Sequence, residues 1–146
     1  MALSMDQWRA IDLFLVRWFN FSYLSRGVCK GDNVPPVSAF SLKTKGRKSG
    51  NWTELAINYF PYGDNYVVLA SNSGQKHHPA WYLNMEADPN CKVHLNWRTR
   101  NVRARVATGD ERARIFADAA KAFPRYDQYV VSAAPREIPV VVLERQ

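Results

Sequence analysis

Two pairs of strand-like segments, each pair joined by a short connection, constrain the fold of this chain more than any other feature. The first pair is residues 53–60 and 66–71, and the turn between them contains a proline, a glycine and an aspartate. The second pair is residues 92–97 and 101–107. Strands joined by so short a connection pair in antiparallel fashion. Because helices do not alternate regularly with strands, the sequence predicts a mainly β fold with attached helices, built as an antiparallel barrel rather than a doubly wound sheet.

The N-terminal region is expected to form a helix over residues 4–26. Ser4, followed three residues later by Gln7, matches the capping box that opens many helices. Apolar residues then recur at intervals of three and four, the period of a helix with one apolar face. This helix is expected to end before Gly27, with a proline-containing loop at residues 31–36. The apolar residues of the stripe are Trp8, Ile11, Leu15, Trp18 and Phe19.

Two further helices and two further strands complete the expected architecture. A proline at position 79 is typical of a first helical turn and indicates a helix over residues 80–87. Thr108 with Glu111 is interpreted as a second capping box, opening a helix that continues to about Ala122. Two short strands are also expected, at residues 39–44 and 138–143. The strand at 138–143 is almost continuously apolar and is therefore expected to be buried.

The chain carries an excess of positive charge, with a formal net charge of +7 and a pI of about 9.6. Such a balance favours anionic partners, namely nucleic acids, membrane surfaces or phosphorylated small molecules. No run approaches the roughly 18 consecutive apolar residues of a membrane-spanning helix, and the first residues lack the layout of a secretory signal. We therefore expect a cytoplasmic protein of one domain, residues 1–146, with the barrel at residues 39–146.

The densest positive charge lies at residues 43–50, where four cationic side chains stand within six residues, beside two glycines. Glycine permits unusual backbone angles, so amide N–H groups can converge on an anion while an arginine supplies paired donors. No lysine-Ser/Thr pair follows the second glycine, so the turn is not a P-loop. A solvated basic turn without a ligand explains the same residues about equally well. Nucleic-acid binding is disfavoured because the cations gather in one turn.

Few residues suggest a catalytic group outright. His77 and His78 are adjacent, so their side chains point apart, and no metal site is expected there. No Ser/His/Asp or Cys/His set can be assembled. Phe123, Tyr126 and Tyr129 are spaced by three residues, which places them on one face of a helical turn. There they are suited to wall a flat pocket, although aromatic side chains more often belong to a core or its rim.

Five blocks of sequence occur in a characteristic order from about residue 39 to the end of the chain. They are LKTKGRKSG at 42–50, YVVLAS at 66–71, PAWYLN at 79–84 with ADP at 87–89, FPRYDQY at 123–129 and REIPVVV at 136–142. In order and spacing these blocks resemble the deazaflavin-dependent nitroreductase family. The resemblance implies a split β-barrel similar to that of flavin-mononucleotide oxidoreductases. It also implies the deazaflavin coenzyme F420 as cofactor, whose anionic phosphate and oligoglutamate tail would explain the basic turn.

The resemblance further implies roles for single residues. Arg47, Lys48 and Ser49 would hold the phosphate or tail of the cofactor. Tyr126 and Tyr129 match family tyrosines that face the substrate, where a phenol both stacks and donates a proton while the reduced ring supplies a hydride. Residues from two strands and one helix would line or pack near the deazaflavin ring. These residues are Ala56, Ile57, Asn58, Ala70, Ser71, Asn72 and Trp81.

The chain departs from the family pattern near the ring, at Thr53, Ala56, Asn58, Asn72 and Phe123. Cofactor binding is expected to persist because the basic turn is intact, whereas activity on bicyclic nitroimidazoles is not expected to carry over. We therefore expect a reductase of quinones, enones or related electron-poor small molecules. An oxidoreductase that binds FMN in the same fold is an alternative, and so is a non-catalytic carrier of cofactor or lipid.

The N-terminal helix carries more aromatic surface than a single packing face requires. Arg9 and Arg17 could meet anionic lipid, so peripheral membrane contact is one interpretation of this helix. Packing against the barrel is the alternative, and it explains most of the apolar stripe. The aromatic residues concerned are Trp8, Phe14, Trp18 and Phe19.

Overall fold

Seven strands form one antiparallel sheet in the computed structural model, which describes residues 2–146. The order across the sheet is β2-β1-β5-β6-β7-β4-β3, and all neighbouring strands run antiparallel, so the predicted fold class is confirmed. The strands are β1 Ala39–Lys45, β2 Trp52–Asn58, β3 Phe60–Tyr62, β4 Asn65–Leu69, β5 Asn90–Leu95, β6 Arg98–Val106 and β7 Val140–Arg145. The helices are α1 Met5–Phe19, α2 Tyr23–Gly31, η1 Asn72–Gly74 (a 3-10 helix), α3 Ala80–Ala87, α4 Gly109–Ala122 and α5 Arg125–Ala133.

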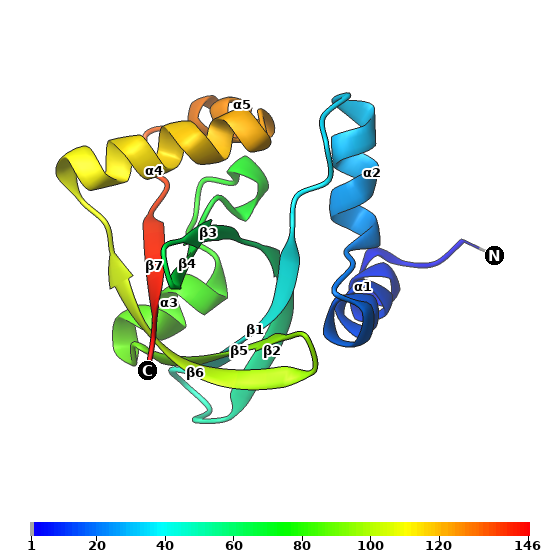
Figure 1. Ribbon diagram of the computed structural model, residues 1–146, viewed down its shortest axis with the longest axis vertical. Helices are drawn as coiled ribbons and strands as arrows, with labels where there is room; N and C mark the ends of the chain where they lie inside the picture. Colours follow the sequence, from blue (N-terminus) through cyan, green and yellow to red (C-terminus); the bar gives the residue numbers. More distant parts are fainter. Residues whose placement is uncertain (1) are drawn as a thin grey trace.

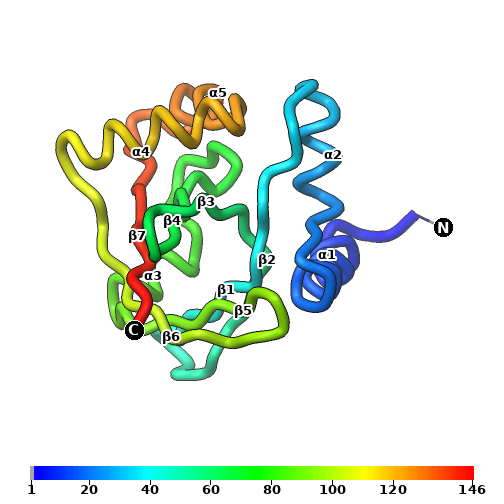
Figure 2. The backbone as a smooth tube through the Cα atoms, in the orientation of Figure 1, coloured from blue at the N-terminus to red at the C-terminus, as the bar shows by residue number. Residues whose placement is uncertain are grey.

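The sheet curls into an open barrel. Strands β2 and β3 are separated in sequence by Tyr59 alone, yet they form the two opposite edges of the sheet. The sheet therefore bends back on itself, and Figures 1 and 2 show it as a curved wall. In Figure 1, α1 and α2 lie beside β1 and β2, while α4 and α5 cover one end of the curl. Within residues 2–146 no strand pairing joins β2 to β3, so the barrel is split at this point.

Both faces of strand β7 are buried, as its apolar sequence predicts. Successive residues of a strand point to opposite faces of the sheet. Val141 and Leu143 belong to the core inside the curl, whereas Val140 and Val142 pack on the other face with Ile115 of α4. The sheet therefore has a core on each side: α3 contributes Trp81, Tyr82 and Met85 to the inner one, and α2, α4 and α5 pack on the outer one.

The single helix predicted over residues 4–26 is wrong, because the chain breaks there into two helices. The capping box is confirmed, since the Ser4 hydroxyl accepts from the Gln7 amide and the Gln7 side chain accepts from the Ser4 amide. Helix α1 ends at Asn20, whose φ of 51° is left-handed, a conformation that asparagine tolerates well. The Ser22 hydroxyl then caps α2, and Gly27, the expected end of the helix, lies inside it.

The second capping box is also wrong, although the helix it introduces, α4, is present. The Thr108 side chain makes no capping hydrogen bond. Glu111 instead accepts from both terminal nitrogens of Arg105, at 2.6 and 3.0 Å, and from the Tyr62 hydroxyl at 2.9 Å. The stronger ion pair with β6 thus removes this carboxylate from the helix terminus. Helix α5 was not predicted as a separate element.

Helix α1 is fixed to the barrel by polar and aromatic contacts. The Arg17 guanidinium donates to the Glu54 carboxylate of β2 at 2.7 Å. The Asn20 side chain exchanges two hydrogen bonds with Asn96 in the β5–β6 turn. The Trp18 ring lies 5.1 Å from that of Trp97 in the same turn. No helix among residues 2–146 is both long and apolar enough to span a bilayer.

Candidate active site

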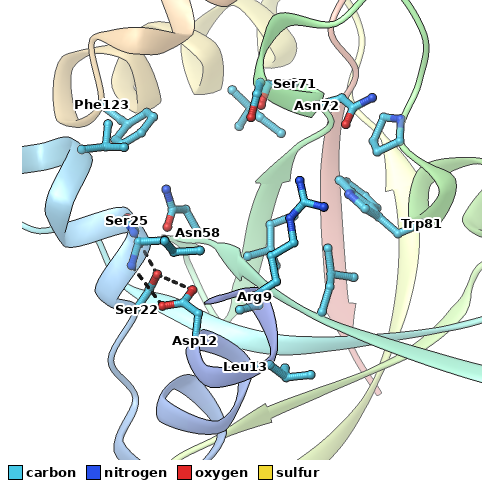
Figure 3. A pocket seen from close by; sticks show the side chains of 18 of the residues that line it. Arg9, Asp12, Leu13, Ser22, Ser25, Asn58, Ser71, Asn72, Trp81 and Phe123 are labelled. Carbon is cyan, nitrogen blue, oxygen red and sulfur yellow. Dashed lines mark hydrogen bonds between the residues drawn. The ribbon is translucent and has the colours of Figure 1, made fainter. Parts of the chain in front are cut away.

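One large cavity opens where the barrel is split. Its volume of about 710 Å³ lies within the range of about 300–1,000 Å³ that is usual for ligand pockets. Five parts of the chain form its walls, namely β2, the segment from β4 into η1, α3, the pair α1–α2, and the segment from Phe123 into α5. Figure 3 shows side chains from these parts converging on one space. Segments far apart in the sequence are therefore needed to build this site.

The wall formed by β2 offers unpaired backbone groups. Ala56, Ile57 and Asn58, three of the predicted ring-lining residues, all line the cavity. Strand β2 pairs with β1 on one side only, because it is an edge of the sheet. Peptide N–H and C=O groups on the other side of an edge strand have no partner within the sheet. This wall is therefore suited to hydrogen-bond the polar rim of a flat heterocycle.

The segment after β4 forms the facing wall. Of the residues predicted for this side of the ring, Ser71, Asn72 and Trp81 line the cavity, whereas Ala70 does not. Ala70 is fully buried, and its carbonyl accepts from the guanidinium of Arg136 at 3.0 Å. Ala70 therefore lies behind the cavity wall, where its carbonyl anchors the segment.

The predicted phosphate-binding residues lie beside the cavity and not in its wall. They are Arg47, Lys48 and Ser49, in the turn between β1 and β2. The backbone amide and the guanidinium of Arg47 both donate to the Asn84 side-chain oxygen, at 3.2 and 3.0 Å. Asn84 lies three residues after Trp81 on α3. The two residues are therefore separated along the helix axis by less than one turn, which is ~5.4 Å. The turn is thus joined to the cavity wall through α3.

The backbone amides of this turn are less available than the two glycines suggested. The Gly46 amide donates to the Asn51 carbonyl, and the Gly50 amide donates to the Gly46 carbonyl. The Arg47 amide is bonded to Asn84. Most of the amides expected to converge on an anion are therefore satisfied within the protein. Positive charge for an anionic ligand comes from the side chains of the turn.

The three aromatic residues spaced by three come together in one wall, as predicted. The ring centroids of Phe123 and Tyr126 lie 5.0 Å apart, and those of Tyr126 and Tyr129 lie 6.2 Å apart. Tyr126 is only 4% exposed, and this burial raises the pKa of its hydroxyl, with Tyr129 adding to the rise and a hydrogen bond to Asn58 opposing it. Tyr129 is less buried and also lines the cavity. The two hydroxyls therefore have different access to solvent.

Sequence reasoning missed the wall that α1 and α2 contribute. Asp12 is 5% exposed, and its carboxylate accepts from the Ser22 hydroxyl at 2.8 Å and from the Leu24 amide at 3.1 Å. These bonds hold the two helices together at the cavity, which Arg9 also lines. The one available signal was the acidic Asp12 within the apolar stripe of the first helix, since a buried carboxylate needs partners.

Comparison with known families agrees with this architecture. The family model described as F420H(2)-dependent quinone reductase matches residues 15–145. A putative F420H(2)-dependent quinone reductase of Mycobacterium tuberculosis is 35% identical over 108 residues, covering 74% of this chain and 90% of the relative. An F420H(2)-dependent quinone reductase of the same species is 28% identical over 150 residues, covering 99% of this chain and all of the relative.

Solved structures point to the same group. A structure described as F420-H2 dependent reductase FDR-A is 30% identical, with a TM-score of 0.66, and the match covers 73% of this chain and 93% of that one. The heme storage protein HutZ from Vibrio cholerae is 13% identical with a TM-score of 0.55, over 74% of this chain and 81% of that one, which shows a shared fold alone. The chain therefore belongs to the family of F420H(2)-dependent quinone reductases, and it is an oxidoreductase whose cofactor is coenzyme F420.

Proposed function

We propose that this protein reduces quinones, and related electron-poor rings such as enones, by positioning them in the 710 Å³ cavity beside the cofactor. The reduced deazaflavin supplies a hydride when bound. One observation carries the proposal: the unpaired edge of β2 and the aromatic wall of Phe123, Tyr126 and Tyr129 line the same cavity. The protein's task is then to hold two flat rings face to face and exclude water between them.

The residues present fit this cofactor. The outer edge of β2 at Ala56 and Asn58 would hydrogen-bond the ring, with Ser71 and Asn72 on the facing wall. The side chains of the basic turn would hold the anionic phosphate or tail, beside Trp81 on α3. A guanidinium and an ammonium group are the donors that phosphates and carboxylates prefer. None of the comparisons supports FMN in place of the deazaflavin.

Tyr129 is the tyrosine that we assign to proton transfer. It lines the cavity and is less buried than Tyr126, so its hydroxyl can regain a proton from solvent. Burial raises the pKa of Tyr126, which makes that hydroxyl a poorer acid. Tyr126 would instead set the shape of the pocket, because it contacts Phe123 and Tyr129 on either side.

The proposed function is tested by binding and by hydride transfer. Fluorescence titration of the purified protein with oxidised F420 and with FMN should show tight binding of F420 alone. Anaerobic stopped-flow mixing of the F420H2 complex with menadione should then regenerate the visible absorbance of oxidised deazaflavin. Cyclohexenone and a nitroaromatic compound in separate experiments define the acceptor range. Tight F420 binding with no turnover of any acceptor would identify a non-catalytic carrier instead.

Peripheral membrane contact is a second proposal, and the exposure of two aromatic residues on α1 is its only support. Phe14 and Phe19 are 55% and 64% exposed on α1. The two arginines named for lipid contact do not support it, because Arg17 is bound to Glu54 and Arg9 lines the cavity. Liposome flotation with anionic vesicles tests the proposal, and a Phe14→Ser/Phe19→Ser variant should lose any co-migration. Cytoplasmic location, also proposed, is tested by cell fractionation.

A further inference from the structure

Three charged side chains line the cavity, and they differ in how well they are paired. Both oxygens of Asp12 accept hydrogen bonds from α2. Glu54 is bound by Arg17 at 2.7 Å and by the Ser41 hydroxyl. Arg9 has only a 3.5 Å contact with an aspartate whose side chain is 92% exposed. Exposed pairs of this kind contribute little, so Arg9 is the charge at the cavity that is free to bind a ligand.

The helices place Arg9 on the cavity side of α1, although its side chain is 68% exposed. Arg9, Asp12 and Leu13 are three and four residues apart on α1, so they share the face that the helix turns toward the cavity. The bonds of Asp12 to α2 hold this face in place. Figure 3 shows the Arg9 side chain extending from α1 into the cavity, its guanidinium toward the side of Ser71 and Trp81. A cation on the N-terminal helices thus faces the wall proposed for the ring.

We infer that Arg9 is a further functional residue of this site, which binds the acceptor oxygen on which negative charge develops. The inference rests on the proposed function. When a quinone takes a hydride and its electron pair, a C=O bond becomes a phenolate oxygen, and a proton from solvent or a hydroxyl completes the hydroquinone. The reduced cofactor loses one hydride to the acceptor and one proton to solvent. A guanidinium stabilises the oxyanion without itself giving up a proton.

The surroundings of Arg9 favour the acceptor over the cofactor as its ligand. The groups proposed to hold the cofactor come from β2, η1, α3 and the basic turn. The lining residues of α1 and α2 around Arg9 include four apolar ones, Ala10, Leu13, Leu24 and Val28, and three polar ones, Asp12, Ser22 and Ser25. The Asp12 carboxylate accepts from Ser22 and from the Leu24 amide, so Arg9 is the charge of this wall that lacks a strong partner. A partly apolar surface with one weakly paired cation suits a flat hydrocarbon ring that carries a carbonyl oxygen. The substrate class indicated is therefore an aromatic quinone that presents one oxygen to α1.

A binding experiment tests this inference without turnover. The probe is 2-hydroxy-1,4-naphthoquinone, whose oxygen is ionised at neutral pH, compared with neutral 1,4-naphthoquinone. Calorimetric titrations use the protein alone and its complex with oxidised F420. Wild-type protein should prefer the ionised ligand, and Arg9→Gln should lose that preference by about tenfold or more, the effect of one charge-assisted hydrogen bond. Arg9→Lys should retain part of it, and affinity for oxidised F420 should stay unchanged.

The matched control is Arg26→Gln on α2, which removes the same charge from a guanidinium that stacks on Phe21 outside the cavity. This variant should behave as wild type. In single-turnover hydride transfer to menadione, Arg9→Gln should slow the step by about 10²-fold, as expected for loss of one oxyanion donor. An unchanged preference for the ionised ligand in Arg9→Gln would overturn the inference, and so would a selective loss of F420 affinity. Absence of hydride transfer in the wild type would refute the proposed function alone, because the binding comparison still decides the role of Arg9.

Discussion

At the scale of single residues, Arg136 organises the cavity wall from a distance in sequence. Its guanidinium donates to the carbonyls of Ala70 at 3.0 Å, Ser71 at 2.8 Å and Gln75 at 2.9 and 3.1 Å. It also donates to the Nδ1 atom of His78 at 3.2 Å. A planar fork of five N–H groups reaches several separated carbonyls at once, whereas a lysine has three N–H groups on a single nitrogen. Arg136 therefore holds three backbone carbonyls of the segment between β4 and α3, to which Ser132 and Asn72 add one hydrogen bond each.

We predict that Arg136→Lys lowers the affinity for oxidised F420 by about tenfold, the effect of losing roughly one hydrogen bond to a charged group. The charge is kept, so long-range attraction of the anionic cofactor is not the cause. Fluorescence titration measures the affinity, and thermal unfolding reports whether the fold survives. Arg103→Lys, on the exposed side of β6, is the matched control and should bind as wild type. Equal affinity in both variants would contradict a positioning role for Arg136.

The two tyrosines of α5 give a second prediction at this scale. Tyr129→Phe should lower kcat by about 10²-fold or more, because general acid assistance is lost. Tyr126→Phe should mainly change KM, since burial raises the pKa of that hydroxyl and leaves it a wall residue. Stopped-flow hydride transfer to menadione measures both variants, each of which retains its aromatic ring. Wild-type kcat in Tyr129→Phe would show that the proton comes from solvent.

At the scale of elements, local signals predicted helix starts better than helix ends. Ser4 and Gln7 form their capping box because no other partner competes for them. Glu111 fails to do so because Arg105, brought near only by the folded sheet, binds it more strongly. The break at Asn20 was visible only as an asparagine, a residue that also occurs inside helices. Partners distant in sequence thus decided the elements that were predicted wrongly.

The basic turn is the element whose function is easiest to isolate. Replacing Arg47 and Lys48 together by Ala should weaken F420 binding by a few kcal/mol, at about 1.5–3 kcal/mol for each charge-assisted hydrogen bond. It should also flatten the salt dependence of binding, because charges that meet the anionic tail are screened by added salt. Titrations at several ionic strengths provide the measurement. The control replaces Arg26 and Lys30 of α2, which removes the same net charge elsewhere. The same loss in both double variants would mean that net charge alone attracts the cofactor.

At the scale of the whole molecule, the family pattern led to most of the cavity wall, but not residue by residue. Eight of the expected residues line the cavity, four within the five blocks and four between or directly after them, whereas the basic turn and Ala70 lie within the blocks and do not line it. The eight residues are Ala56, Ile57, Asn58, Ser71, Asn72, Trp81, Tyr126 and Tyr129. The wall from α1 and α2 lay outside those blocks. It depends on a chain break at Asn20 and on contacts such as Arg17 with Glu54, 37 residues apart in sequence. Contacts of that range are fixed by packing and not by a local pattern.

Two histidines, one buried and one partly buried, make the stability of the whole fold depend on pH. Burial lowers the pKa of His94, and nearby Arg17 lowers it further, against an opposing effect of Glu54. Burial likewise lowers the pKa of His78, with Arg136 adding to the effect and Glu86 opposing it. A histidine with a depressed pKa takes up its proton more readily in the unfolded chain. Unfolding is therefore coupled to proton uptake below the ordinary histidine pKa of about 6.5.

We predict that the free energy of unfolding is constant above about pH 7 and falls as the pH drops through about 6.5. It should level off once the lower folded-state pKa values are passed. The Glu111 carboxylate does not titrate within this pH window, because its hydrogen bond to Arg105 lowers its pKa to about 2. Urea unfolding between pH 7.5 and pH 5.5 is the measurement.

Two variants test which groups cause the slope. His78→Gln and His94→Gln should each flatten it, because the amide oxygen can still accept from Arg136 or Thr99 without titrating. His77→Gln, at an exposed position, is the control and should keep the wild-type slope. If neither His78→Gln nor His94→Gln changed the slope, the pH dependence would come from other groups. The repulsion between protonated His78 and Arg136 would then not be its cause.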